Sequence, residues 1–196
     1  VDFANGIRSI MRQDPDIILV GEVRDADTAT MAFRAAMTGH QVFTTLHTNS
    51  ALGTFPRLLD IGISPDIMAG NIIGVVAQRL VRVLCPHCKE AYAPNDDERK
   101  LLGKNVRLDL RIHRAIGCKQ CGYAGYRGRM AIMELLRVDS EMDALVARRA
   151  HFDEMRDLAL KKGFVTLAED GIRRIIEGHT SLSEVMRVID LTSRIN

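Results

Sequence analysis

The sequence has little net charge and no long apolar segment. Its 27 basic and 25 acidic residues leave a formal charge of +2, so no general electrostatic attraction to nucleic acid or membrane is indicated. Like charges do not gather into a block that would act as a tail. The apolar runs are far shorter than the roughly 20 residues that cross a bilayer, and the first residues show no signal-peptide pattern. With 196 residues, 46% of them apolar, the chain can build one large core or two small ones.

Apolar periodicity predicts an α/β fold in the first part of the chain. A helix is expected between Asp2, a suitable N-cap, and Asp14, and the unbroken apolar run IILV predicts a strand at 17–20. A helix at 28–37 and a β-branched strand at 42–46 follow. Because strand, helix and strand alternate at short spacing, we expect a parallel sheet, with 17–20 as a central strand covered on both faces.

The rest of the chain is predicted to be mainly helical around a turn-rich insert. We expect a helix that ends near residue 60, a second from residue 64 to about residue 80, and a strand at 130–138. Helical spacing of apolar residues then continues over 140–192. The S/T-x-x-E pattern occurs twice there, at Thr166 and at Ser181, and predicts a capping box at each helix start.

Four cysteines form two C-x₂-C pairs: Cys85, Cys88, Cys118 and Cys121. Without a secretory signal, such pairs indicate a metal site, since four thiolates complete the tetrahedral shell of a structural Zn²⁺ and leave no position for catalysis. Two disulfides or free buried thiols are the alternatives. His87 and His113 could also act as ligands, but the complete cysteine set makes them unnecessary.

Polar residues follow both predicted strands of the sheet. Glu22 comes directly after the first strand and Gly21, and His47 follows the second strand. Parallel strands bind ligands at their carboxyl ends, so we expect these two side chains at one edge of the sheet. An acidic residue there could hold Mg²⁺ or orient an attacking water in phosphoryl transfer. The alternatives are a solvated charged turn at Glu22 and an ordinary hydrogen-bonding role for His47.

The same segments carry a family resemblance that covers nearly the whole chain. The residues concerned are IRSIMRQDPDIILVGEVRD, TGHQVFTTLHTNSA, LVRVLCPHC and CKQCGYAGYRGRMAIMELL. Together they resemble the ATPases that drive type II secretion and type IV pilus assembly. DPDIILVGEVRD is similar to the Walker B segment of that family, and TGHQVFTTLHTNS is similar to its His box.

The resemblance implies a RecA-like ATPase that hydrolyses ATP with Mg²⁺. It also implies a homohexamer that works at the cytoplasmic face of the inner membrane on a platform protein, without binding nucleic acid. By position, Glu22 would polarise the attacking water and His47 would lie near the γ-phosphate. Arg8, Arg12 and Arg24 match arginines that make nucleotide or intersubunit contacts, for which the planar guanidinium is suited. For Arg8 and Arg12 the alternative is a solvated helix face.

The sequence departs from the family at the phosphate-binding loop. No G-x-x-x-x-G-K-[ST] motif occurs, and the chain opens on Val rather than Met. We expect this loop to precede Val1 in a longer protein, so that the chain alone binds and hydrolyses ATP poorly. Three regions are then predicted: half of a RecA-like core at 1–84, a tetracysteine subdomain at 85–129 and a helical region at 130–196.

The cysteine insert also separates related functions. Pilus-retraction ATPases resemble the first part of the chain but lack the insert, so its presence favours a machine that assembles a pilus or pseudopilus. The alternative is a zinc-ribbon module that binds nucleic acid, with the Gly- and Arg-rich segment at 122–129 as its contact. Near-neutral charge disfavours that alternative, because phosphate binding needs a concentrated basic face.

Overall fold

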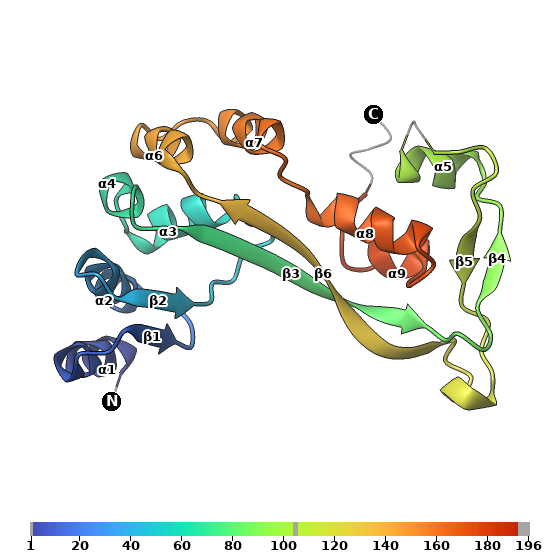
Figure 1. Cartoon of the computed structure of the whole chain (residues 1–196), viewed down its shortest axis with the longest axis horizontal. Helices are drawn as coiled ribbons and strands as arrows, with labels where there is room; N and C mark the ends of the chain where they lie inside the picture. Colours follow the sequence, from blue (N-terminus) through green and yellow to red (C-terminus); the bar gives the residue numbers. More distant parts are fainter. Residues whose placement is uncertain (1, 104–105, 192–196) are drawn as a thin grey trace. The chain divides into compact units, whose positions relative to one another are not determined.

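The computed structural model describes residues 2–103 and 106–191, which divide by their contacts into two compact units (Figure 1). Unit 1 comprises the chain up to Ala77 together with Leu135–Phe164, and unit 2 comprises Gln78–Glu134 together with the chain from Val165. Neither unit is continuous in sequence. The three regions predicted from the sequence therefore stay a prediction, since the two units do not test them. The end of the predicted helical region, 192–196, lies outside the described residues.

The helices and strands alternate along the chain as follows. Unit 1 contains α1 (Phe3–Ile10), η1 (Met11–Gln13), β1 (Ile17–Val20), α2 (Ala26–Met37), β2 (Gln41–Thr44), α3 (Thr54–Ile61), α4 (Pro65–Met68), α6 (Ser140–Ala147) and α7 (Phe152–Lys161). Unit 2 contains β4 (Glu90–Tyr92), α5 (Asp96–Leu102), β5 (Ile112–Arg114), η2 (Lys119–Cys121), α8 (Leu167–Ile176) and α9 (Leu182–Met186). The paired strands β3 (Gly74–Leu84) and β6 (Tyr126–Arg137) contribute residues to both units.

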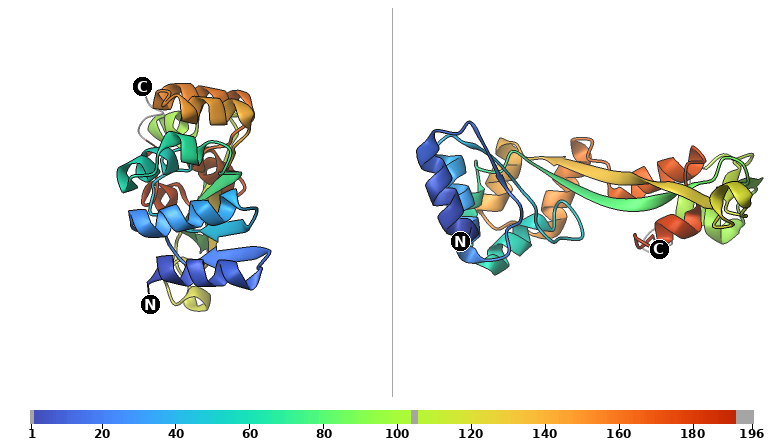
Figure 2. Two further views of the ribbon diagram at one scale, coloured as in Figure 1. Left: turned by 90° about the vertical axis from the view of Figure 1, so that its left-hand side faces the viewer. Right: turned by 90° about the horizontal axis from the view of Figure 1, so that it is seen from below.

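Strands β1 and β2 form the predicted parallel pair, with Ile17 opposite Gln41 and Val20 opposite Thr44. The helix start at Asp2 is confirmed, since its carboxylate accepts the backbone N–H of Asn5 at 2.8 Å. Helices α1 and α2 lie side by side in both views of Figure 2 and pack on one face of the pair. The shared core consists of Ile7, Ile18, Val20, Met31 and Ala35.

The expectation that the first strand is covered on both faces is wrong for the described residues. Ile18 and Val20 are buried, whereas Ile17 is 62% and Leu19 is 78% exposed. The reason is that α1 and α2 lie on the same face, and within 2–103 and 106–191 nothing covers the other. An unbroken apolar run thus has one buried and one open side here, as alternation along a strand requires.

The predicted helix from residue 64 to about residue 80 is also wrong. Helix α4 ends at Met68, and Gly70 follows with a φ of 77°, which continues no right-handed helix. The segment GVVAQRLVRVL that follows is rich in valine and forms β3 instead. Pro56 fits α3 because it lies in the first turn, where no intrahelical N–H bond is lost.

The predicted helices of the C-terminal part are present as α6 to α9, but only one of the two capping boxes is complete. Thr166 accepts the N–H of Glu169, and the carboxylate of Glu169 accepts the N–H of Thr166 at 2.8 Å. At the second site Ser181 accepts the N–H of Glu184 at 3.2 Å. The carboxylate of Glu184 does not return to Ser181, so the prediction of a full box there is wrong.

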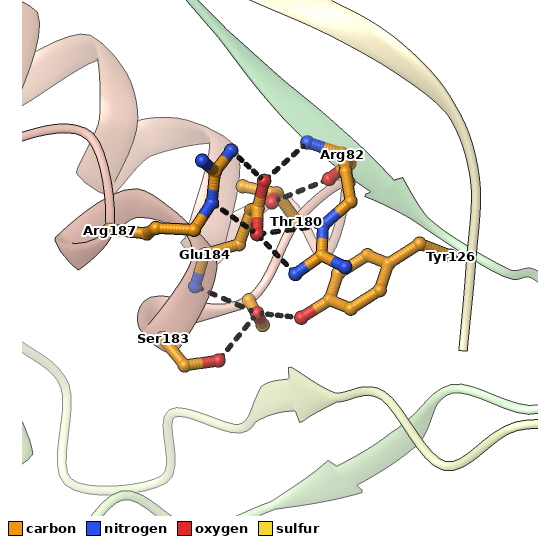
Figure 3. Close-up of polar contacts among 7 residues, drawn as sticks. Arg82, Tyr126, Thr180, Ser183, Glu184 and Arg187 are labelled. Carbon is orange, nitrogen blue, oxygen red and sulfur yellow. Dashed lines mark hydrogen bonds and ion pairs between the residues drawn. The ribbon is translucent and has the colours of Figure 1, made fainter. Parts of the chain in front are cut away.

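Glu184 instead binds two arginines from inside unit 2 (Figure 3). Its side chain is fully buried, and it accepts the backbone N–H of Arg82 at 3.0 Å and the guanidinium of Arg82 at 2.6 Å. Arg187 adds a hydrogen bond at 2.8 Å. The Arg82 guanidinium also stacks 4.1 Å from the centre of the Tyr126 ring. One carboxylate therefore joins α9 to β3, and the arginine stack extends the contact to β6.

Two more buried carboxylates attach α8 to β6 in the same way. Asp170 of α8 accepts the backbone N–H of Met133 at 2.9 Å, and Glu134 of β6 accepts that of Leu167, the first residue of α8, at 2.9 Å. Backbone N–H groups at a strand edge or in the first turn of a helix have no partner within that element, and they need one when they are buried. Carboxylates supply those partners here, so α8 and α9 are held by charge-assisted hydrogen bonds.

The Glu184 contact predicts an acid-sensitive stability. Burial opposes ionisation of Glu184, but hydrogen bonds from Arg187 and Arg82 outweigh burial and lower its pKa from 4.5 to about 2. A lowered folded-state pKa contributes stability that is present above the unfolded value and is lost as the pH falls from about 4.5 toward 2. Urea unfolding should therefore show Glu184→Gln less stable than wild type at pH 7, with the difference shrinking below pH ~4.5.

The exposed pair of Glu90 with Arg114 provides the control, since Glu90→Gln should change the free energy of unfolding by less than about 1 kcal/mol at any pH. A pH-independent difference for Glu184→Gln would show that the carboxylate charge is not what joins α9 to β3.

Candidate functional site

The carboxyl ends of β1 and β2 bring together an acidic and an imidazole side chain. Glu22 follows β1 and Gly21, and His47 follows β2 and Thr45. His47 Nε2 lies 3.1 Å from Glu22 Oε2, and Arg24 forms an ion pair with the other oxygen of the same carboxylate. The predicted proximity of Glu22 and His47 is confirmed by this contact, while their roles stay predictions.

Thr45 fixes the backbone on both sides of Glu22. Its hydroxyl donates to the carbonyl of Gly21 at 2.7 Å, and its own carbonyl accepts the N–H of Val23 at 3.0 Å. The ladder of the parallel pair thereby continues past Thr44, and buried Val23 anchors the segment. Sequence reasoning missed Thr45, since a threonine at the end of a β-branched strand has no distinguishing local signal.

The electrostatics keep Glu22 ionised. The Arg24 hydrogen bond, followed by that of His47, lowers the pKa of Glu22 against the opposing effect of partial burial. A carboxylate in this state accepts hydrogen bonds or binds a cation, and it does not serve as a proton donor near neutral pH. The side chains of Arg24 and His47 are 70% and 79% exposed, so both are accessible to a ligand at this edge.

The other two predicted arginines lie apart from this pair. Arg8 of α1 donates to Asn5 of the same helix at 2.8 Å, and Arg12 lies exposed in η1. Neither contacts Glu22 or His47 within the described residues. The structure thus brings together Glu22, Arg24 and His47 from the predicted set, and Arg8 and Arg12 keep solvated positions on the first helical segment.

The four cysteines form a second candidate site, in unit 2. Their Sγ atoms all lie within 4.8 Å of one another, and three of the separations, including Cys85 to Cys118 and Cys88 to Cys121, are 3.9 Å. The cysteines are free, so disulfides are absent among the described residues. A tetrahedral ion with Zn–S bonds of about 2.3 Å requires sulfur separations of about 3.8 Å. The arrangement therefore fits a metal such as Zn²⁺.

Backbone N–H groups around the cysteines point at the sulfurs. Gly117 donates to Cys88 at 3.3 Å, and the N–H groups of Cys118 and Gly125 each donate to Cys121 at 3.2 Å. These last two bonds lower the pKa of Cys121 to about 6, while burial raises the pKa of Cys88 to about 12. A bound cation would favour the thiolate at both. Amide donors of this kind are what a thiolate cluster needs.

The two histidines considered as alternative ligands stand outside the cluster. His87 is exposed, and His113 of β5 lies against the end of α8, where its Nδ1 is buried without a hydrogen-bonding partner. Burial and the nearby Lys89 ammonium lower the pKa of His113. The same Lys89 donates to the carbonyl of Gly178 at 2.9 Å. His113 and Lys89 therefore contact the chain at the end of α8 and do not act as further ligands beside the four cysteines.

A family model described as "Type II/IV secretion system protein" matches residues 1–187. The chain belongs to this family. Type II secretion system protein E of Pseudomonas aeruginosa is 47% identical over 186 residues, which cover 95% of this chain and 37% of that protein. Type IV pilus assembly ATPase TfpB of Acinetobacter baylyi is 45% identical over 192 residues, with 97% and 33% covered. The chain thus spans about a third of the length of these curated relatives.

Solved structures show the same fold. The pilus retraction motor PilT with bound ADP superposes with a TM-score of 0.66 at 24% identity, over 96% of this chain and 44% of that one. The Legionella pneumophila ATPase DotB gives 0.64 at 24% identity, over 95% and 42%. The predicted family and α/β class are therefore confirmed. Within the described residues, no helix has the length and apolar character to cross a membrane.

The sulfur geometry predicts one metal ion per chain. Native mass spectrometry should find one Zn²⁺ bound, and chelation should release it and increase hydrogen exchange first within residues 85–121. The reason is that metal affinities of roughly 10–16 kcal/mol in structural zinc peptides become local folding energy. Cys118→Ser should abolish stoichiometric binding, whereas His87→Ala should leave it intact. Metal-free native protein, or loss of metal in His87→Ala, would contradict the four-cysteine assignment.

Proposed function

We propose that this chain carries the catalytic carboxylate of an ATP-hydrolysing motor that powers pilus or pseudopilus assembly, in type IV pilus biogenesis or type II secretion. The observation that carries the proposal is the contact of Glu22 with His47 at the shared carboxyl edge of β1 and β2. Family membership supports it, since relatives such as the type II secretion system ATPase E of Vibrio cholerae are named as ATPases.

The residues at this edge suit phosphoryl transfer. ATP would supply the phosphoryl group, with Mg²⁺ neutralising its phosphate charges. Glu22, ionised and held in place by Thr45, would accept a hydrogen bond from the attacking water. His47 is exposed enough to contact a phosphate while keeping its link to Glu22. Arg24 could exchange its ion pair with Glu22 for a phosphate oxygen, and Arg8 and Arg12 are proposed for nucleotide or intersubunit contacts.

The rest of the active site would come from chain outside these residues. The sequence contains no phosphate-binding loop motif. The exposed side chains of Ile17 and Leu19 give β1 an apolar face on which further elements of a RecA-like core would pack. We therefore propose that these residues alone hydrolyse ATP poorly. The whole protein would act as a homohexamer at the cytoplasmic face of the inner membrane, on a platform protein, with structural Zn²⁺ at the four cysteines.

Glu22→Gln tests the central role. The amide keeps the shape of the side chain but removes its charge, so the full-length protein should bind ATP with unchanged affinity and hydrolyse it at least about 100-fold more slowly. Steady-state hydrolysis and a fluorescent-nucleotide titration measure the two quantities. Glu98→Gln, in the other unit, serves as control and should hydrolyse ATP at the wild-type rate. Near wild-type turnover of Glu22→Gln would exclude Glu22 as the catalytic carboxylate.

Thr45→Val tests the positioning of that carboxylate. Valine keeps the shape and β propensity but cannot donate to the Gly21 carbonyl, so we expect kcat to fall by about tenfold with KM unchanged, as a misplaced catalytic group requires. Thr45→Ser should restore most of the activity. Thr44→Val is the matched control, since the neighbouring hydroxyl has no hydrogen-bond partner among the described residues. An equal effect of both valines would show a general requirement of β2 instead.

A further inference from the structure

Among residues 2–103 and 106–191, five α-helices end in the same backbone pattern. In each, one N–H past the end returns to a carbonyl five residues earlier and the preceding N–H returns to a carbonyl three residues earlier, which is the Schellman motif. The longer bonds run from His40 to Ala35, from Ile63 to Leu58, from Ala150 to Leu145, from Phe164 to Ala159 and from His179 to Arg174, and they close α2, α3, α6, α7 and α8. The residue whose N–H makes the shorter bond must adopt a left-handed conformation.

Glycine occupies that left-handed position in four of the five helices: Gly39, Gly62, Gly163 and Gly178. Helix α6 ends instead on Arg149, with a φ of 53°. A residue with a Cβ adopts this conformation at a cost in free energy that glycine avoids. The sequence thus keeps an arginine side chain at a position where glycine would serve the fold better, and such a departure from a local rule points to a use for the side chain.

Arg149 is one of the residues that line an apolar groove within unit 1. The groove encloses about 160 Å³ between α3, α4, α6 and α7. Met68 and Met155 are among its buried residues, and Leu59 and Phe152 leave 37% and 40% of their surfaces exposed. A closed apolar cavity of roughly 150 Å³ accepts benzene. The groove is therefore large enough for one bulky apolar side chain, and its methionines can adapt to the shape of that side chain.

The guanidinium of Arg149 has no charged partner among the described residues. Arg148, the neighbour of Arg149, forms an ion pair with Glu154 of α7. Arg149 has neither an ion pair nor a side-chain hydrogen bond among the described residues. A single guanidinium beside an apolar groove complements a carboxylate attached to an apolar group. A phosphate site would instead gather several arginines.

We propose that this groove binds an acidic peptide segment of a partner protein. One bulky apolar side chain of the segment enters between α3, α4, α6 and α7, and a nearby Asp or Glu carboxylate pairs with Arg149. The surface is built from residues other than Glu22, His47 and the cysteines. It does not depend on the proposed ATPase function and would give the motor a separate point of attachment.

Peptide selection on the full-length protein tests this surface. A random heptapeptide library displayed on phage is selected on the wild-type protein, and the enriched peptides are synthesised and titrated. We expect them to combine Phe, Leu, Ile or Met with Asp or Glu. Arg149→Gly should weaken their binding by at least about tenfold, and Arg149→Lys should weaken it less, because a lysine keeps the charge but not the bidentate geometry.

A stability measurement on the same variants distinguishes binding from folding. Arg149→Gly removes the unfavourable left-handed arginine and should leave the melting temperature unchanged or raise it by about 2–4 °C. Gly163→Arg is the matched control at the end of α7, where an added Cβ meets nothing within 4 Å but φ is 84°. It should lower the melting temperature and leave peptide binding unchanged.

Three results would overturn the proposal. One is a selection that yields no acidic apolar peptides, as expected if another part of the protein covers the groove. Another is equal binding of the selected peptides to wild type and Arg149→Gly. The third is a lower melting temperature of Arg149→Gly, since that would give the arginine a structural role in α6.

Discussion

The register of the parallel β1–β2 pair is the constraint on which the candidate active site depends. Ile18 and Val20 face Ile7 of α1 and Ala35 of α2, so a slip by one residue would turn Ile17 and Leu19 into that core. Packing of two helices on one face thus selects the register, and the Thr45 hydrogen bonds carry it past the last paired residues. Glu22 and His47, far apart in sequence, meet as a consequence of that packing.

In unit 2, buried carboxylates connect the helices to the strands. Strands β3 and β6 present backbone N–H groups to α8 and α9, and the buried carboxylates of Glu184 and Asp170 accept them. The cysteine turns, which follow β3 and precede β6, rely on N–H groups that point at sulfur. The first set loses its strength when carboxylates are protonated, and the second when a metal is withdrawn. Unit 2 is therefore stabilised by two kinds of contact with independent chemistry.

Features of the fold and site that are local in sequence were predictable. The β1–α2–β2 order, the cysteine pairs and the Asp2 and Thr166 caps follow from short patterns. The adjacency of Glu22 and His47 is not local, but it follows from the rule that parallel strands share their carboxyl edge. The errors arose where distant residues decide. The segment after α4 has apolar residues that suit either helix or strand, and pairing with β6 makes it a strand. Similarly, Glu184 gives up its capping role because Arg82 lies beside it in space.

A residue whose conformation is unusual for its type therefore marks a position where contacts with residues distant in sequence decide the structure. Three described residues other than glycine have a positive φ: Asp14, Tyr123 and Arg149. Aspartate tolerates this conformation, and Tyr123 is held in it by a hydrogen bond to Cys118 within the cysteine turn. For Arg149 the described part of the chain offers no such reason, since its backbone pattern is one that glycine completes in four other helices. The proposed acidic peptide, which would pair with the Arg149 side chain, accounts for an arginine at this position.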